Sequence, residues 1–340
     1  MRGRAARQRA PYASQTVKIA INSYASVEGG GLVYLQALYH SLPTLMPERD
    51  FLFIVPSGTL AVETPSRRVQ VIETNVARQS WWRRFWWEQV ELPRRLKQQR
   101  VDVYLSHSGS CLLARPVPQA QTLANALYFH PTYWSQYVPH KQWQVRQELR
   151  LRRLLVCLFA RRADLLVLFS NFMHELLPAS LCRGRRLLVS SPGANIPIQD
   201  QPPRYEGGCF RVLHVSLYAD YKNLLTLLLA LKMLVAEAEV NFEFVTTAKP
   251  DPRARAASVT YAREMELLAD PVLARQVRLL GPVDFPTVLR LYAESHIFVW
   301  PSAVESFGHP LLEAMSFGLP IVAADTPLNL APIVIDEITL

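Results

Sequence analysis

The chain has 340 residues, of which half are hydrophobic and 19% are charged, and its formal net charge is +9. At roughly 100–200 residues per domain this length predicts about two globular domains, and the high apolar content with modest charge favours a folded over a disordered chain. The four cysteines are widely spaced, which excludes a local zinc knuckle or a CxxC redox pair and favours a reducing compartment.

The first predicted segment is a disordered basic leader over residues 1–16, because its four arginines precede no apolar stretch of the kind a secretory signal needs. Short apolar runs then alternate with helix-length amphipathic stretches, a pattern typical of parallel α/β sheets. No run of about 18 apolar residues exists, so no transmembrane helix is expected. Strands are predicted at 17–22, 51–55, 69–73, 101–106, 121–126, 165–169 and 186–190, and helices at 32–42, 83–99, 143–162 and 171–181.

Segment 192–208 is rich in proline and glycine, which break both helices and strands, and it is predicted to be a domain boundary. After it the alternation restarts, with strands expected at 210–216, 242–246, 277–279, 297–300 and 320–323 and helices at 222–236, 259–268 and 310–317. The sequence therefore predicts an α/β protein with an N-terminal domain over 17–195 and a C-terminal domain over 209–340.

Charge is unevenly divided between these two regions. Residues 1–200 hold 26 Lys and Arg against 12 Asp and Glu, whereas residues 201–340 hold 11 against 16. This asymmetry indicates an anionic partner for the first half, such as a membrane surface or a phosphorylated acceptor, or it is only a solubilising charge. Nucleic acid is not expected as a partner, because no recognition motif accompanies the charge. Six basic residues lie on the helix predicted at 143–162: Arg146, Arg150, Arg152, Arg153, Arg161 and Arg162.

Segment 81–87 combines four tryptophans with two arginines. Arginine flanked by tryptophan suits a bilayer interface. The alternative is a helix that buries Trp86, Val90 and, in its fullest form, Trp82 in the N-terminal core. Partial burial leaves Trp81 and Trp82 as candidates for membrane contact.

The strongest signal for chemistry lies between residues 300 and 315. A strand ending at Trp300 leads through a loop with Gly308 into a helix, and the free N–H groups at a helix start favour an anion such as a diphosphate. Gly308 allows the backbone to approach a ligand closely, and Pro310 suits the first helical turn. Glu305 and Glu313 flank the helix start, so both can face one cleft at the carboxyl edge of the sheet. Alternatively, they are exposed or capping acids.

This segment reads Pro301-Ser-Ala-Val-Glu305-Ser-Phe-Gly-His-Pro-Leu-Leu-Glu313-Ala-Met and is followed by Gly318-Leu-Pro-Ile-Val-Ala. It resembles the E-x7-E motif of retaining GT-B glycosyltransferases of family 4, the group 1 type. Weaker likenesses follow the family's order over nearly the whole chain, at Asn22–Gly31, Ser170-Asn171-Phe172, Val215-Ser216, Tyr221-Lys222-Asn223, Gly281, Leu291-Tyr292 and Ile297–Trp300. The resemblance implies two Rossmann-like domains that face a cleft, with the acceptor on the N-terminal side and the nucleotide sugar on the C-terminal side.

The resemblance also implies roles for particular residues. Glu305 would contact the donor sugar, and Glu313 would hold the ribose hydroxyls. Lys222 would neutralise the leaving diphosphate, where a cation stabilises developing charge. His130, and with it His107, follows a predicted strand in a region where family members often carry a histidine near the substrates, although either can be an ordinary loop residue. Further donor contacts are implied for Asn223, Ser306, Phe307, Gly308, His309, Gly30 and Gly31.

Three features depart from the family pattern. Ser216 stands where an arginine is usual, so one phosphate-binding cation is missing. Lys249 lies after the strand 242–246, where the family has glycine nearby, and it is a candidate to replace that charge. The chain stops at Leu340, where family members continue with further helices, and the C-terminal domain is therefore expected to be incomplete.

The function implied by the resemblance is transfer of a sugar, with retention, from a UDP- or GDP-type donor to a lipid-linked or polysaccharide acceptor. No D-x-D sequence is present, so no metal or other cofactor is expected. The implied location is cytoplasmic, with peripheral contact to an anionic membrane at its inner face. The alternatives are a truncated, inactive GT-B protein that binds nucleotide or membrane, and a GT-B sugar epimerase, which fits the E-x7-E pattern less well.

Overall fold

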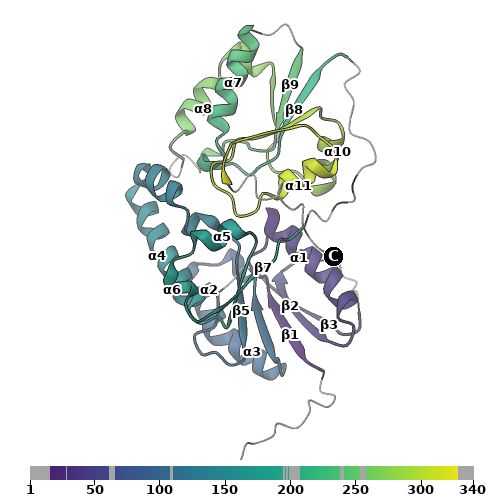
Figure 1. Cartoon of the computed structure of the whole chain (residues 1–340), viewed down its shortest axis with the longest axis vertical. Helices are drawn as coiled ribbons and strands as arrows, with labels where there is room; N and C mark the ends of the chain where they lie inside the picture. Colours follow the sequence, from purple (N-terminus) through teal and green to yellow (C-terminus); the bar gives the residue numbers. More distant parts are fainter. Residues whose placement is uncertain are drawn as a thin grey trace, which may run out of the picture.

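The protein is described by a computed structural model over residues 16–27, 29–60, 66–107, 110–193, 196, 198, 207–237, 241–252 and 258–327. Two parallel β-sheets form two lobes stacked along the long axis, which we call the N-terminal domain (16–193, lower in Figure 1) and the C-terminal domain (207–327, upper). The predicted leader lies almost wholly outside the described residues. Segment 328–340 also lies outside the described residues, so the expected incompleteness of the C-terminal domain stays a prediction.

The N-terminal domain is built on a seven-stranded sheet in the order β3-β2-β1-β4-β5-β6-β7, with every neighbouring pair parallel. Strand β2 is buried along nearly its whole length, as expected for a parallel sheet covered on both faces. The strands are β1 Lys18–Asn22, β2 Asp50–Pro56, β3 Val69–Thr74, β4 Val103–Ser106, β5 Gln119–Leu123, β6 Leu165–Leu168 and β7 Arg186–Val189.

The helices of this domain pack into separate buried clusters. Helix α1 shares a cluster with β1 and β2, whereas α4 and α5 share another with β5 and β6. The α-helices are α1 Gly29–Leu45, α2 Trp81–Trp86, α3 Leu92–Gln98, α4 Trp143–Ala160, α5 Asn171–Leu176 and α6 Ala179–Cys182. Short 3₁₀ turns lie at η1 Val76–Arg78, η3 Ala126–Tyr128 and η5 Val138–His140, and π-helical turns at η2 Trp87–Glu91 and η4 Tyr133–Tyr137.

The C-terminal domain has a five-stranded parallel sheet in the order β10-β9-β8-β11-β12. Its strands are β8 Phe210–His214, β9 Phe242–Thr246, β10 Val277–Leu279, β11 Ile297–Trp300 and β12 Ile321–Ala323. Its helices are the 3₁₀ turn η6 Asp220–Lys222 and α7 Leu224–Glu237, α8 Tyr261–Leu268, α9 Pro271–Ala274, α10 Phe285–Ala293 and α11 His309–Ser316. This order of strands and helices confirms the predicted α/β class with two Rossmann-like domains.

The predicted helix 171–181 is wrong in one respect, since it is two short helices. The side chain of Ser170 accepts a hydrogen bond from the Met173 amide at 3.2 Å and starts α5. The chain then becomes extended at Leu177, and Pro178 precedes α6. Proline disfavours a helical conformation in the residue before it, which explains the break.

The predicted burial of Trp86 is also wrong. Trp86 is 51% exposed, whereas Trp87 is 5% exposed and belongs to the core. The π-helical turn η2 begins at Trp87, directly after α2. A π-helical turn places an extra residue in the helix and so shifts which side chains face the sheet. Trp81 and Trp82 stack on each other with ring centroids 4.0 Å apart, and they are 38% and 66% exposed.

The strand predicted at 121–126 ends earlier, at Leu123. The side chain of Asn125 accepts a hydrogen bond from the Leu127 amide at 2.9 Å and starts the turn η3. His130 therefore follows a 3₁₀ turn and not a strand, which corrects the predicted position of this residue.

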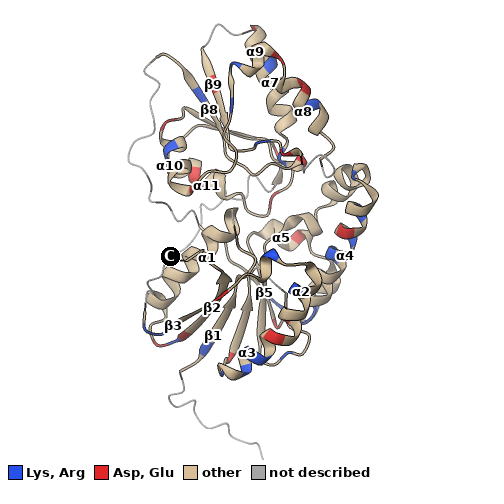
Figure 2. Cartoon of the chain, turned by 180° about the vertical axis from the view of Figure 1, so that it is seen from behind, with Lys and Arg blue, Asp and Glu red and all other residues tan. Residues whose placement is uncertain are grey.

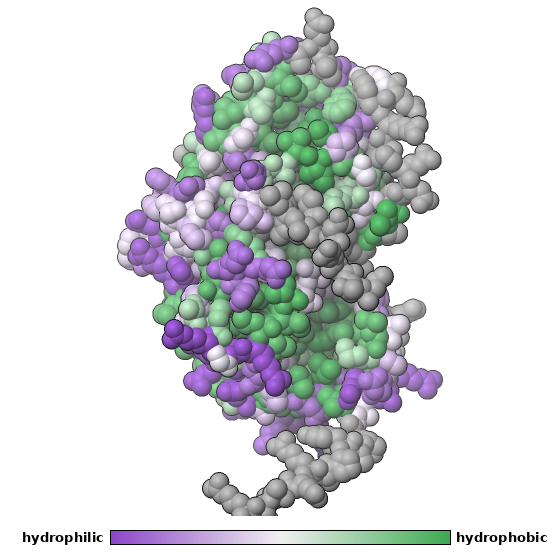
Figure 3. Space-filling view, in the orientation of Figure 1, coloured by the Kyte–Doolittle hydropathy of each residue, from purple (hydrophilic) through white to green (hydrophobic). Residues whose placement is uncertain are grey.

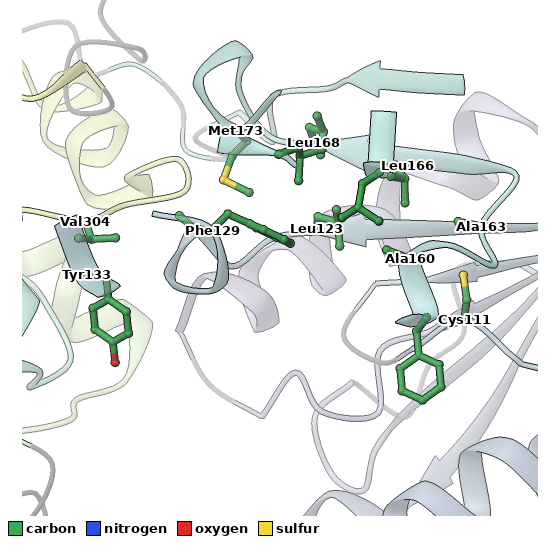
Figure 4. Packing of buried hydrophobic residues seen from close by; sticks show 14 of the residues in the cluster. Cys111, Leu123, Phe129, Tyr133, Ala160, Ala163, Leu166, Leu168, Met173 and Val304 are labelled. Atoms are coloured by element: carbon green, nitrogen blue, oxygen red, sulfur yellow. The ribbon is translucent and has the colours of Figure 1, made fainter. Parts of the chain in front are cut away.

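The two domains share a buried apolar contact. The largest cluster of the N-terminal domain includes Val304 of the C-terminal domain, which is 2% exposed and lies at one end of the cluster in Figure 4. Tyr221 and Ala303, also of the C-terminal domain, pack against the same cluster. The loop after β11 and the turn η6 are thus held against the N-terminal domain.

One face of the C-terminal sheet carries an apolar groove of about 610 Å³ beside α7. Apolar side chains gather on this domain in the view of Figure 3. The lining is Phe210, Val212, Leu227, Ala230, Leu231, Leu234, Phe242, Phe244, Ile297, Val299 and Val322. Within the described part of the chain, no helix is both long enough and apolar enough to cross a membrane.

Candidate active site

An ion pair between Lys222 and Glu305 lies where the C-terminal domain meets the N-terminal domain. Lys222 ends the turn η6 and Glu305 lies in the loop after β11, and their side chains are only 14% and 10% exposed. The ammonium group of Lys222 also lies 4.9 Å from the ring centroid of Trp300. The structure therefore brings together the residue predicted to neutralise the diphosphate and the residue predicted to contact the donor sugar.

Helix α11 begins beside this ion pair. Its N-cap, Gly308, has φ 82° and ψ 51°, and a Cβ atom there would lie 3.2 Å from Leu311 Cδ1, so the position requires glycine. His309 is the first residue of the helix. Burial lowers the pKa of His309 to about 4, and nearby Lys222 acts in the same direction. The imidazole is therefore neutral near pH 7, and its Nδ1 has no hydrogen-bond partner among the described residues.

The N-terminus of α1 faces this site from the other domain. A Cβ atom on Gly30 would lie 2.9 Å from His309 Cδ2, and one on Gly29 would lie 3.7 Å from Leu217. Gly31 lies beside Ser26, whose buried hydroxyl has no partner among the described residues. Two helix starts with free N–H groups, those of α1 and α11, thus lie on opposite sides of the domain boundary, which suits an anionic ligand.

Glu313 is held inside the C-terminal domain. It is 5% exposed, and its carboxylate accepts a hydrogen bond from the Tyr292 hydroxyl at 2.9 Å. Burial raises the pKa of Glu313, and the bond from Tyr292 opposes this shift. Tyr292 was part of a sequence resemblance, but no sequence pattern indicated that it bonds to Glu313.

Three further predicted donor contacts, Asn223, Ser306 and Phe307, lie around the same loop. Asn223 adopts the left-handed conformation with φ 60°, and its side chain lies 3.4 Å from the Pro301 carbonyl. The Ser306 carbonyl accepts a bond from Ser170 of the N-terminal domain at 3.3 Å. The Phe307 ring is 4% exposed. Their backbone positions are therefore fixed by contacts within and between the domains.

The two histidines of the N-terminal domain are both buried. His107 is 4% exposed and lies 4.6 Å from the Tyr34 ring, and burial lowers its pKa to about 4. A hydrogen bond to the Gly31 backbone opposes that shift and ties His107 to the start of α1. His130 is 8% exposed and packs 5.9 Å from the Phe172 ring, and burial lowers its pKa. Of the two, His107 has the direct contact with the glycine loop, so His130 is the weaker candidate for contact with a ligand there.

The departures from the family pattern lie at the carboxyl edge of the C-terminal sheet. The Ser216 amide donates to Thr247 Oγ1 at 2.8 Å, and the Ser216 hydroxyl donates to the Leu217 carbonyl at 2.9 Å. Lys249 is exposed, and its aliphatic stem lies 3.5 Å from where a Cβ of Gly281 would be. That Lys249 supplies the positive charge of the missing arginine stays a prediction. Over the residues that the structure describes, no group of three or more His, Cys, Asp or Glu side chains is arranged to hold a metal ion.

Residues 209–339 match the family model described as "Glycosyl transferases group 1". Over 165 residues the chain is 26% identical to O-antigen chain mannosyltransferase B of Escherichia coli, an alignment that covers 48% of this chain and 41% of that protein. The chain thus aligns with less than half the length of this curated relative.

Solved structures of other proteins share the fold. Sucrose-phosphate synthase from Thermosynechococcus elongatus superposes with a TM-score of 0.65 at 15% identity, over 91% of this chain and 82% of that one. A glycosyltransferase from Rickettsia africae superposes with a TM-score of 0.59 at 17% identity, over 95% and 83% of the two chains. Such likeness identifies the GT-B fold alone. Residues 209–339 therefore match a group 1 glycosyltransferase domain, and the chain as a whole has the GT-B fold, in agreement with the predicted resemblance.

Proposed function

We propose that the chain is a retaining glycosyltransferase that moves a sugar from a UDP- or GDP-type donor to a lipid-linked or polysaccharide acceptor. The observation that carries this proposal is the partly buried Lys222–Glu305 pair beside the start of α11, with the start of α1 opposite. A cation, a carboxylate and two helix N-termini supply the groups that a sugar diphosphate needs. The name of the E. coli relative, an O-antigen chain mannosyltransferase, favours a hexose donor and a cell-surface glycan acceptor.

In this proposal Lys222 and the N–H groups of Phe307, Gly308 and His309 stabilise the departing diphosphate. Glu305 orients the donor sugar, and Glu313 accepts bonds from the ribose hydroxyls. The acceptor enters from the N-terminal domain and attacks on the face from which the diphosphate leaves, so that the sugar configuration is retained. No metal ion is required, because Lys222 and the N–H groups stabilise the negative charge that develops on the diphosphate.

We also propose peripheral contact with an anionic membrane, through one surface of the N-terminal domain. Helix α4 exposes Leu151, Leu154 and Leu158, which are 44%, 63% and 40% exposed. Lys and Arg are spread along α4 and occur on α2 in Figure 2. Exposed leucine and tryptophan among arginines suit the interface of an acidic bilayer. This contact would keep the enzyme at the cytoplasmic face, where lipid-linked acceptors are reached.

A ligand panel tests the proposal. UDP, GDP and their sugars are added to the protein, and a rise in melting temperature identifies the base, since a ligand that binds only the folded state stabilises it. Lys222→Met and Glu313→Gln should each weaken nucleotide binding about ten- to hundredfold, as expected for loss of a charge-assisted hydrogen bond. Lys232→Met is the matched control, because Lys232 is 55% exposed and pairs with Asp270 on the surface.

Transfer is then measured with the donor identified in this way and a lipid-linked oligosaccharide acceptor. Retained configuration in the product supports the proposal. A sugar isomer formed without acceptor would favour an epimerase, and nucleotide binding without any turnover would favour a non-catalytic partner. No binding of any nucleotide would contradict the assignment of the site.

A further inference from the structure

A second buried ion pair joins the two domains, next to the turn that carries Lys222. Lys141 of the N-terminal domain lies between η5 and α4, and its ammonium nitrogen is 2.5 Å from Asp220 Oδ2 of the C-terminal domain. The two side chains are 4% and 3% exposed. Removing charges from water in this way is unfavourable unless they are paired, so the two residues stabilise each other across the domain boundary.

Aromatic rings enclose this ion pair. The Lys141 ammonium lies 5.7 Å from the ring centroid of Tyr133 in the N-terminal domain. Tyr221 of the C-terminal domain meets the same Tyr133 ring edge-on, with centroids 5.8 Å apart. The rings exclude water from the pair and continue the apolar contact made by Val304.

Asp220 begins the turn that ends at Lys222. Its second carboxylate oxygen accepts a bond from the Tyr221 amide at 2.9 Å. The Tyr221 carbonyl in turn accepts a bond from the Ala303 amide at 2.9 Å, in the loop that carries Glu305. Asp220, which pairs with Lys141, is therefore connected to Lys222 within one turn. It is connected to the loop of Glu305 through the Tyr221–Ala303 hydrogen bond.

We propose that Lys141 is a positioning residue, which holds Asp220 and thereby fixes Lys222 and Glu305 relative to the N-terminal domain. This inference rests on the proposed function, in which the donor is bound by the C-terminal domain and the acceptor by the N-terminal domain. An apolar contact alone leaves the two domains free to slide, whereas a buried ion pair has one favourable geometry. Small displacements of reacting groups slow transfer strongly, because alignment supplies much of the rate.

The sharpest test separates donor binding from turnover. In Lys141→Met the affinity for the nucleoside diphosphate should change less than threefold, because Lys222, Glu313 and the start of α11 belong to one domain and only the start of α1 lies in the other. The kcat for transfer should fall at least tenfold, with little change in the KM for the donor. Lys232→Met again serves as the control, since its ion pair lies within one domain, and it should alter neither quantity.

Two double variants keep the test decisive if Lys141→Met folds poorly. Lys141→Met combined with Asp220→Leu replaces the pair by apolar side chains and should restore folding but not kcat. Lys141→Asp combined with Asp220→Lys reverses the pair and should recover more kcat than either single change. Full kcat in Lys141→Met, or in the apolar double variant, would overturn the inference.

Hydrogen exchange supplies a readout that does not depend on activity. The amides of Tyr221 and Lys222 should exchange at least tenfold faster in Lys141→Met than in the parent. Their exchange rates should be unchanged in Lys232→Met. Equal protection in parent and Lys141→Met would count against a positioning role even if no sugar donor had been found. Absence of any transfer by the parent, with the exchange result as expected, would instead count against the proposed function alone.

Discussion

The imidazole of His309 lies against Gly30 across the domain boundary, so closely that a Cβ atom on Gly30 would be 2.9 Å from the ring carbon Cδ2. Glycine in a helix is ordinarily less favourable than alanine by about 1 kcal/mol. The close approach of two helix starts therefore explains why a glycine stands at this position.

Gly30→Ala should weaken nucleotide binding about tenfold, or about 1.4 kcal/mol, because the His309 ring must move away from its place at the start of α11. Isothermal titration with the preferred nucleotide measures the effect. Gly31→Ala provides the comparison, since its Cβ would lie 3.4 Å from the Ser26 hydroxyl and the effect should be smaller. Adding His309→Ala to Gly30→Ala should remove the clash, and a double variant no better than Gly30→Ala would argue against it.

The buried His309 should make stability depend on pH in a defined direction. Its pKa is lowered to about 4 in the folded protein, against about 6.5 in an unfolded chain. Between these values the unfolded state binds more protons, so stability should fall as pH decreases from 6.5. Relative to His309→Gln, the parent should lose roughly 1 kcal/mol by pH 5.5.

Thermal melts of the parent and His309→Gln between pH 7.5 and 5.0 measure this difference. His107 and His214 also have lowered pKa values, about 4 and about 3, but both proteins carry them and their contributions cancel. If the melting temperatures of the parent and of His309→Gln changed in parallel with pH, His309 would not be desolvated.

Trp86 and Trp87 should differ sharply in their contribution to stability. Trp87→Ala removes a side chain that is 5% exposed, and large-to-small changes of this kind cost about 3–5 kcal/mol. Trp86→Ala changes a side chain that is 51% exposed and should cost less than about 1 kcal/mol. Denaturant unfolding of the two variants measures both values, and equal losses would contradict the helical register set by the π-helical turn.

Membrane contact should depend on exposed apolar side chains of the N-terminal domain. Trp82→Ala and Leu154→Ala should each reduce co-sedimentation with vesicles that contain acidic phospholipid, while Met233→Ala, a 62% exposed residue of the C-terminal domain, should not. Binding of the parent should weaken as salt rises, because the arginines contribute through screened charge. Equal binding to neutral vesicles, or none to acidic ones, would refute the proposed surface.

Much of the fold could be predicted because buried parallel strands are short apolar runs, which a sequence displays directly. The errors have local causes. The side chain of Asn125 turns the chain where apolar residues continue, and the π-helical turn that begins at Trp87 interrupts the regular α-helical period. Neither feature changes the spacing of hydrophobic residues enough to be recognised in the sequence.

The candidate site was only partly predictable, for a different reason. Glu305, Gly308 and Glu313 lie within one strand–loop–helix unit, so their spacing could suggest a common site. Lys141 and Asp220 are 79 positions apart and belong to different domains. Their pairing depends on how the two domains pack against each other. A sequence pattern within one helix or strand contains no information about that packing.

The position of Trp300 has a practical consequence. Six of the seven tryptophans lie between residues 81 and 143, and Trp300 is the one that follows residue 200. Its indole ring lies beside the Lys222 ammonium, so the charge that should meet a phosphate also acts on the indole's excited state. Intrinsic fluorescence therefore offers a label-free optical signal of occupancy, and the Trp300→Phe protein supplies the background to subtract.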